Sequence, residues 1–64
     1  MADAASTEIY NGITQGTISA SEVGAASFGA ELDSAVGRVD FYSSLYGKLK
    51  AAGSNAAGEI KRLL

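Results

Sequence analysis

The spacing of the large apolar residues is what most constrains how this chain can fold. Between Phe28 and Leu49 these residues recur at steps of four and three positions, which places them along one side of an α-helix. The same steps continue beyond Leu49 to the end of the chain. We call this series the apolar seam, and its larger members are Phe28, Leu32, Val39, Tyr42, Tyr46, Leu49, Ile60 and Leu63. The seam predicts an all-α protein built on one long amphipathic helix over about residues 20–63.

Local signals predict where this main helix begins and where it is interrupted. Ser19 with Glu22 three residues later has the pattern of a capping box, in which the two side chains satisfy backbone N–H groups at a helix start. The main helix is therefore predicted over residues 19–63. Gly53-Ser54-Asn55 is typical of a turn, so the helix is expected either to kink at residues 53–55 or to end there, with a short last helix after it.

The N-terminal part carries weaker signals. Residues 1–7 are small and polar, and we expect them to be flexible. Residues 8–18 contain two isoleucines four apart, which favours a short helix, but their β-branched residues leave an extended arm open. Gly12 and Gly16 begin a stripe of small residues, which indicates either close approach of another backbone or a flexible turn. The whole chain, residues 1–64, is predicted to be a single small helical domain.

One aromatic residue lies off the seam. On a helical wheel Phe41 projects about half a turn from Leu32, so the helix has more than one apolar face. The chain has 64 residues, no Cys and no His, which excludes disulfides and the usual soft metal ligands as sources of stability. Self-association remains, and no metal or cofactor is predicted. We therefore predict that Phe41 and the seam residues form the interface between many copies of the chain.

Charge is divided along the sequence. Residues 1–33 contain five acidic side chains and no basic one, whereas residues 34–64 contain five basic and two acidic side chains. Within one long helix this order complements the helix macrodipole. Alternatively, the acidic part of one subunit pairs with the basic part of another and sets their register. The candidates for such pairing are Glu22, Glu31, Asp33, Arg38, Lys48, Lys50, Lys61 and Arg62.

Other functional classes find little support in the sequence. A serine nucleophile has no histidine to activate it, and no enzymatic activity is predicted. Lys48 and Lys50 lie near two tyrosines, as in some single-strand binders, but the tyrosines belong to the seam and the pI is near 4.7, so no nucleic-acid binding is predicted. No run approaches the roughly 18 apolar residues of a membrane-spanning helix.

The second half of the chain resembles a known family. Asp40-Phe41-Tyr42-Ser43-Ser44-Leu45-Tyr46, followed by Gly53-Ser54-Asn55-Ala56 and a short amphipathic end, is similar to the subunits of type III secretion needles and Hrp-type pili. The resemblance covers about residues 40–64. The chain lacks the proline-containing turn of the needle proteins and is shorter than most of them, and its length and its Ala, Gly and Ser content are closer to Hrp-type pilins.

The resemblance implies a structural subunit of a hollow, helical, extracellular filament that serves as a conduit for protein secretion. Such a pilin is secreted unfolded, polymerises with copies of itself on the cell surface, and has the secretion apparatus and transiting unfolded proteins as partners. The alternative is a small helical-hairpin or coiled-coil module, located in the cytoplasm, that forms a discrete dimer for protein–protein interaction. The filament subunit and the dimeric module both require a helical surface and a partner chain.

Overall fold

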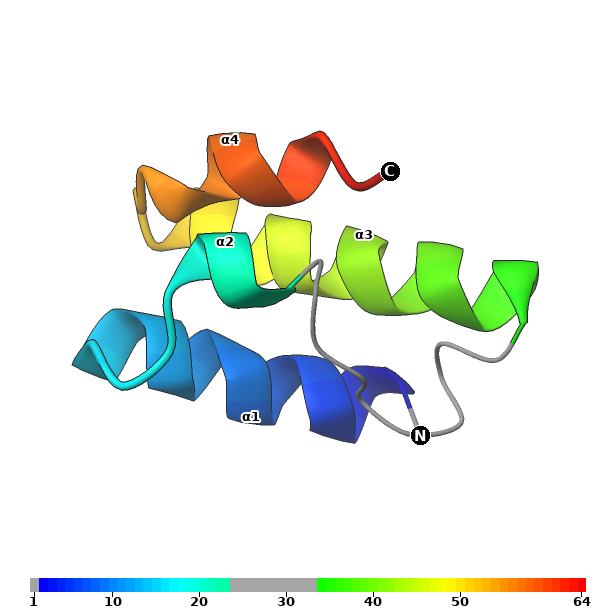
Figure 1. Ribbon diagram of the computed structural model, residues 1–64, viewed down its shortest axis with the longest axis horizontal. Helices are drawn as coiled ribbons and strands as arrows, with labels where there is room; N and C mark the ends of the chain where they lie inside the picture. The colour runs from blue at the N-terminus through cyan, green and yellow to red at the C-terminus, as the bar shows by residue number, and fades with distance from the viewer. Residues whose placement is uncertain (1, 24–33) are drawn as a thin grey trace.

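The computed structural model describes residues 2–23 and 34–64, and these residues form an all-helical structure (Figure 1). The helices are α1 (Ala2–Gln15), α2 (Ala20–Val23), α3 (Ala35–Ala51) and α4 (Ala56–Lys61). No strand occurs among the described residues. The all-α class is confirmed, and α3, with 17 residues, is the long helix of the structure. How copies pack in a filament stays a prediction.

The helices are arranged around α3. Helix α1 packs along α3, and in Figure 1 the two helices run in the same direction along the long axis. Helix α4 packs against α3 on its other side and runs in the opposite direction, and α2 contacts α4. The chain thus supplies helical partners for α3 from within itself.

One hydrophobic core lies between these helices. Its completely buried apolar side chains come from α2, α3 and α4 and are Val23, Phe41, Leu45, Leu49 and Ile60. On α3 the core residues Phe41, Leu45 and Leu49 are four positions apart, so they form one stripe along the helix. The buried face of α3 is therefore rotated from the predicted seam, because Phe41, which lay off the seam, is central and Val39 is exposed.

The prediction of one helix from about residue 20 to residue 63 is wrong at its N-terminal side. Helix α3 begins only at Ala35, because Ser34 has an extended backbone (φ −126°, ψ 155°) and its Oγ accepts a hydrogen bond from the Gly37 N–H at 2.9 Å. This N-cap ends any continuous helix at residue 34. A four-residue helix, α2, does begin after Ser19, whose hydroxyl donates to Glu22 Oε1 at 3.0 Å.

The C-terminal end of α3 lies where the turn was predicted. Gly53 has φ 71°, the Gly53 N–H donates to the Lys50 carbonyl at 3.0 Å, and the Ser54 N–H donates to the Leu49 carbonyl at 2.9 Å. This pair of hydrogen bonds is a Schellman motif, which ends a helix at a residue in the left-handed conformation. Residues 53–55 therefore separate α3 from α4.

Helix α1 ends in the same way. Gly16 has φ 81°, the Gly16 N–H donates to the Ile13 carbonyl at 3.2 Å, and the Thr17 N–H donates to the Gly12 carbonyl at 2.9 Å. The helical alternative for residues 8–18 is thus the one observed, and the extended arm is not. A close approach at Gly12 was predicted for another backbone, but the group that lies there is the Ile18 side chain. A Cβ added to Gly12 would come within 2.5 Å of it.

Of the start predicted to be flexible, residues 2–7 belong to helix α1, which begins at Ala2. Alanine has the highest helix propensity, and the start of the chain is rich in it. In addition, the Ser6 side chain is completely buried against α3, so the first turns of α1 are held by packing.

Two glycine substitutions test the Schellman motif at the end of α3. Gly53→Ala forces a Cβ into a left-handed backbone, and we expect it to lower the free energy of unfolding by about 1–2 kcal/mol. Gly47→Ala is the matched control, because Gly47 lies inside α3 with nothing within 4 Å of an added Cβ. It should raise stability by about 0.8–1 kcal/mol through helix propensity. Urea unfolding followed by circular dichroism measures both; equal effects would contradict this account of the turn.

Candidate assembly surfaces

The nine residues predicted to form an assembly interface occupy different environments. Phe41, Tyr42, Leu49 and Ile60 lie in the chain's own core, and Tyr46 is half-buried beside it. Val39 and Leu63 are exposed. Phe28 and Leu32 lie outside the described residues. The folded chain therefore presents only a part of the seam to another copy, and it brings the core members together by intramolecular packing.

The first exposed apolar surface is at the start of α3. Val36 is 72% exposed and Val39 is 55% exposed, and both lie on the side of the helix away from Phe41 and Leu45. With Ala35 and Asp40 they line a shallow pocket of about 260 Å³. We call Ala35, Val36 and Val39 the α3 patch. Val39, which was predicted to lie on the seam, is thus a surface residue of the folded chain.

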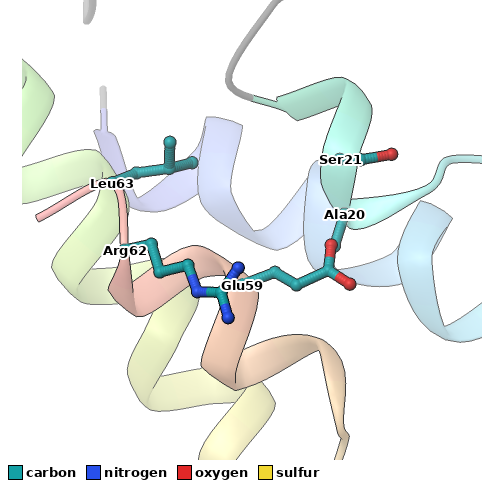
Figure 2. Close-up of a pocket in the computed structure, with 5 residues that line it drawn as sticks. All are labelled: Ala20, Ser21, Glu59, Arg62 and Leu63. Carbon is teal, nitrogen blue, oxygen red and sulfur yellow. The ribbon is translucent and has the colours of Figure 1, made fainter.

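The second exposed apolar surface lies after α4, where Leu63 is 37% exposed and Leu64 is 52% exposed. We call these two residues the C-terminal patch. Leu63 borders a pocket of about 390 Å³ between α2 and α4, which Ala20, Ser21, Glu59 and Arg62 also line. In Figure 2 the Glu59 side chain extends toward Ala20, and Arg62 lies on the Leu63 side of the pocket. The patch is thus bordered by one acidic and one basic side chain.

The charged candidates for pairing between subunits have varied surroundings. Lys50 Nζ lies 5.8 Å from the centre of the Tyr46 ring, a cation–π contact within α3. Lys48 Nζ donates to Ser44 Oγ at 3.1 Å. Arg38, Lys61, Arg62 and Glu22 are exposed, and Glu31 and Asp33 lie outside the described residues. Of the exposed basic candidates, Arg38 lies in the first turn of α3, Lys50 in its last turn, and Lys61 and Arg62 at the end of α4.

A partly buried polar contact that the sequence did not indicate joins α1 to α3. Ser6 Oγ and Ser44 Oγ are 2.8 Å apart, and Ser6 is completely buried. With the Lys48 ammonium group on Ser44, this makes a chain of polar groups, Lys48 to Ser44 to Ser6. The only sequence signal was the four-residue separation of Ser44 and Lys48 on one helix face. Nothing in the sequence pointed to Ser6 as their partner.

This polar chain is better placed to hold two helices together than to catalyse a reaction. A serine nucleophile must reach substrate, and burial of Ser6 prevents that. Another pocket, of about 340 Å³, is lined by Ala5, Glu8, Ile9 and Ile18, and neither it nor the two pockets described above is lined by these serines or by Lys48. Among the described residues, no three His, Cys, Asp or Glu side chains gather as metal ligands would.

None of the helices within residues 2–23 and 34–64 combines the length and hydrophobicity needed to cross a bilayer. Comparisons with protein-family models, with curated proteins and with solved structures gave no significant match.

Proposed function

We propose that the chain is a structural subunit that assembles with copies of itself into a helical filament. The observation that carries this proposal is the presence of two separate exposed apolar surfaces, the α3 patch and the C-terminal patch. Large exposed apolar side chains grouped on a small protein commonly mark protein–protein contact. A contact between one patch and the other patch of the next copy is heterologous, and such contacts produce open filaments when they do not close into a ring.

The proposed filament is an extracellular, type III or Hrp pilus-like conduit for protein secretion. The resemblance of residues 40–64 to those pilins motivates this part of the proposal, and the absence of Cys suits passage of an unfolded chain through a channel. The proposed partners are further copies of the subunit, the secretion apparatus and the proteins in transit. The compact core means that each subunit would bring a folded unit to the filament, with contacts made by its exposed patches.

A second candidate is a small helical module that forms a discrete dimer. The observation that favours it is the complete burial of Phe41, Leu45 and Leu49 within one chain, since a subunit with a finished core needs only one patch for association. Two α3 patches packed face to face would form a closed, isologous contact. Such a dimer leaves the C-terminal patch unused, and that difference separates the two candidates.

The purified chain at high concentration tests the proposal. We expect negative-stain electron microscopy to show long polymers of uniform width, and sedimentation velocity to show a broad, concentration-dependent distribution of large species. A single small species whose sedimentation does not change with concentration would refute the filament. If that species has twice the mass of the chain, the result supports the discrete dimer in place of the filament.

A further inference from the structure

The pocket at the α3 patch combines apolar side chains with one carboxylate. It is lined by Ala35, Val36, Val39 and Asp40. Asp40 is exposed and is the charged residue of this lining, since Arg38, the basic residue nearest to it in the sequence, does not line the pocket. The volume of about 260 Å³ is below the roughly 300–1,000 Å³ of pockets for small-molecule ligands. The pocket therefore suits a few apolar side chains that lie beside a positive charge.

The C-terminal patch has that combination of groups. The Leu63 N–H donates to the carbonyl of the completely buried Ile60 at 2.9 Å, and the Leu64 N–H donates to the Lys61 carbonyl at 3.1 Å. These hydrogen bonds hold the two leucines in place relative to α4. Lys61 and Arg62 are exposed, and Figure 2 places Arg62 on the Leu63 side of the pocket between α2 and α4. The patch thus presents two leucines next to positive charge.

The two patches belong to different surfaces of one chain. The pocket at the α3 patch is lined by α3 residues alone, whereas Leu63 lines the pocket between α2 and α4, and the two pockets share no lining residue. Within the described part of the chain, the C-terminal patch therefore does not occupy the pocket at the α3 patch. A C-terminal patch that fills this pocket has to come from a second copy.

Charge favours contact between unlike patches. Two α3 patches packed face to face would bring two Asp40 carboxylates into one apolar contact, and like charges at an interface oppose association. Two C-terminal patches would likewise bring together the cations of Lys61 and Arg62. One patch of each kind instead places a guanidinium group beside a carboxylate, a pair that can form two parallel hydrogen bonds.

We infer that Leu63 and Leu64 of one copy dock in the pocket at the α3 patch of the next copy, with Arg62 of the first copy paired to Asp40 of the second. Each copy then has one acidic, apolar pocket and one basic, apolar patch that fills it. The contact has a direction, and its repetition links copies head to tail. This inference rests on the proposed self-assembly and names the side chains that make its contact.

Charge reversal tests the pairing, because both side chains are exposed and can be changed without disturbing the core. Asp40→Lys makes both patches basic, and Arg62→Glu replaces the guanidinium group with a carboxylate. We expect each variant alone to need a roughly tenfold or higher concentration to form sedimentable polymers. An equal mixture should polymerise like the natural chain, since the introduced lysine meets the introduced glutamate and the remaining Asp40 meets the remaining Arg62.

The composition of the polymers gives a second readout. Because favourable contacts form only between the two different variants, the copies alternate along the polymer. When the variants are mixed in unequal amounts, the pellet should still contain equal amounts of both, which mass spectrometry measures. Circular dichroism of each variant alone should show the helix content of the natural chain, which separates a lost contact from unfolding.

Glu8→Lys is the matched control. Glu8 is exposed and lines another apolar pocket, with Ala5, Ile9 and Ile18, so the same change of charge is made at a surface that the inference leaves unused. This variant should polymerise like the natural chain. A loss of polymers as severe as in Asp40→Lys would place the docking site elsewhere and overturn the inference.

The remaining outcomes separate the pairing from the filament. Natural assembly by Asp40→Lys or Arg62→Glu alone, or a mixture that stays unassembled, would overturn the pairing while the filament stands. A natural chain that forms a small closed species, lost in each variant and restored in the mixture, would support the pairing and refute the filament. A natural chain that stays monomeric at high concentration would overturn both.

Discussion

Phe41→Ala is expected to unfold the monomer. Phe41 is completely buried, and its ring meets Tyr42 edge to face with the centroids 5.2 Å apart. Replacing a buried Phe with Ala costs about 3–5 kcal/mol, through lost burial and the cavity that remains. The core of a protein this small rarely supplies more than about 3–5 kcal/mol, so the variant should lose its cooperative unfolding transition. Circular dichroism during thermal denaturation measures this loss.

Loss of the unfolding transition would show that Phe41 belongs to the core of one chain. The sequence had instead predicted that Phe41 contacts another copy. A purely intermolecular Phe41 would leave the helix content of dilute Phe41→Ala unchanged and would affect only polymers. Phe41→Leu, which retains most of the apolar volume, should still fold, with a cost below about 1.5–2 kcal/mol. Val36→Ala is the surface control, because Val36 is 72% exposed and the change should stay within about 0.5 kcal/mol.

Val39→Asp should abolish assembly while leaving the monomer folded. Val39 is 55% exposed in the α3 patch, so the monomer tolerates a carboxylate there. In a packed interface between copies the same carboxylate would be desolvated without a partner, at a cost of about 3 kcal/mol or more. Every 1.4 kcal/mol is tenfold in affinity, so the concentration needed for polymers should rise by roughly a hundredfold or more. Pelleting assays over a concentration series give this threshold.

Asn55→Asp is the matched control for charge. It adds the same negative charge at an exposed position in the turn before α4, away from the α3 patch. We expect it to polymerise like the natural chain. Leu63→Asp extends the test to the C-terminal patch. Loss of polymers in both patch variants supports a heterologous contact, whereas loss in Val39→Asp alone, with Leu63→Asp unaffected, favours the dimer through α3.

The sequence identified the helical class and the turn at residues 53–55, because these depend on local chemistry. The absence of proline allows helices throughout the chain, and Gly-Ser-Asn favours a turn at its own position. Gly53 ends α3 through its own backbone conformation. The start of α3 was missed, since Ser34 is one of many serines and its capping role appears only once Gly37 donates to it. Several serines have similar local sequences, so the sequence does not show which of them caps a helix.

Which face of α3 is buried was predicted less well than the presence of the helix. Apolar residues are spread around this helix, so both the seam through Val39 and the stripe through Phe41 fit a helical period. The choice between them was made by packing, because α1 and α4 meet the Phe41, Leu45 and Leu49 side. The Ser6–Ser44 contact was beyond sequence reasoning for a related reason: it joins residues 38 positions apart, and nothing local to either serine reports the other.

That same separation has a consequence for the order in which the chain folds. The α3–α4 unit closes through the short turn at Gly53, whereas docking of α1 on α3 closes a segment of 38 residues. Loop-closure entropy rises by about 0.6 kcal/mol for each doubling of loop length, and local contacts therefore form sooner. We expect the α3–α4 hairpin to belong to the folding nucleus and α1 to arrive after the rate-limiting step. Substitutions at Ile9 would then speed unfolding with little change in the folding rate, which stopped-flow kinetics would show.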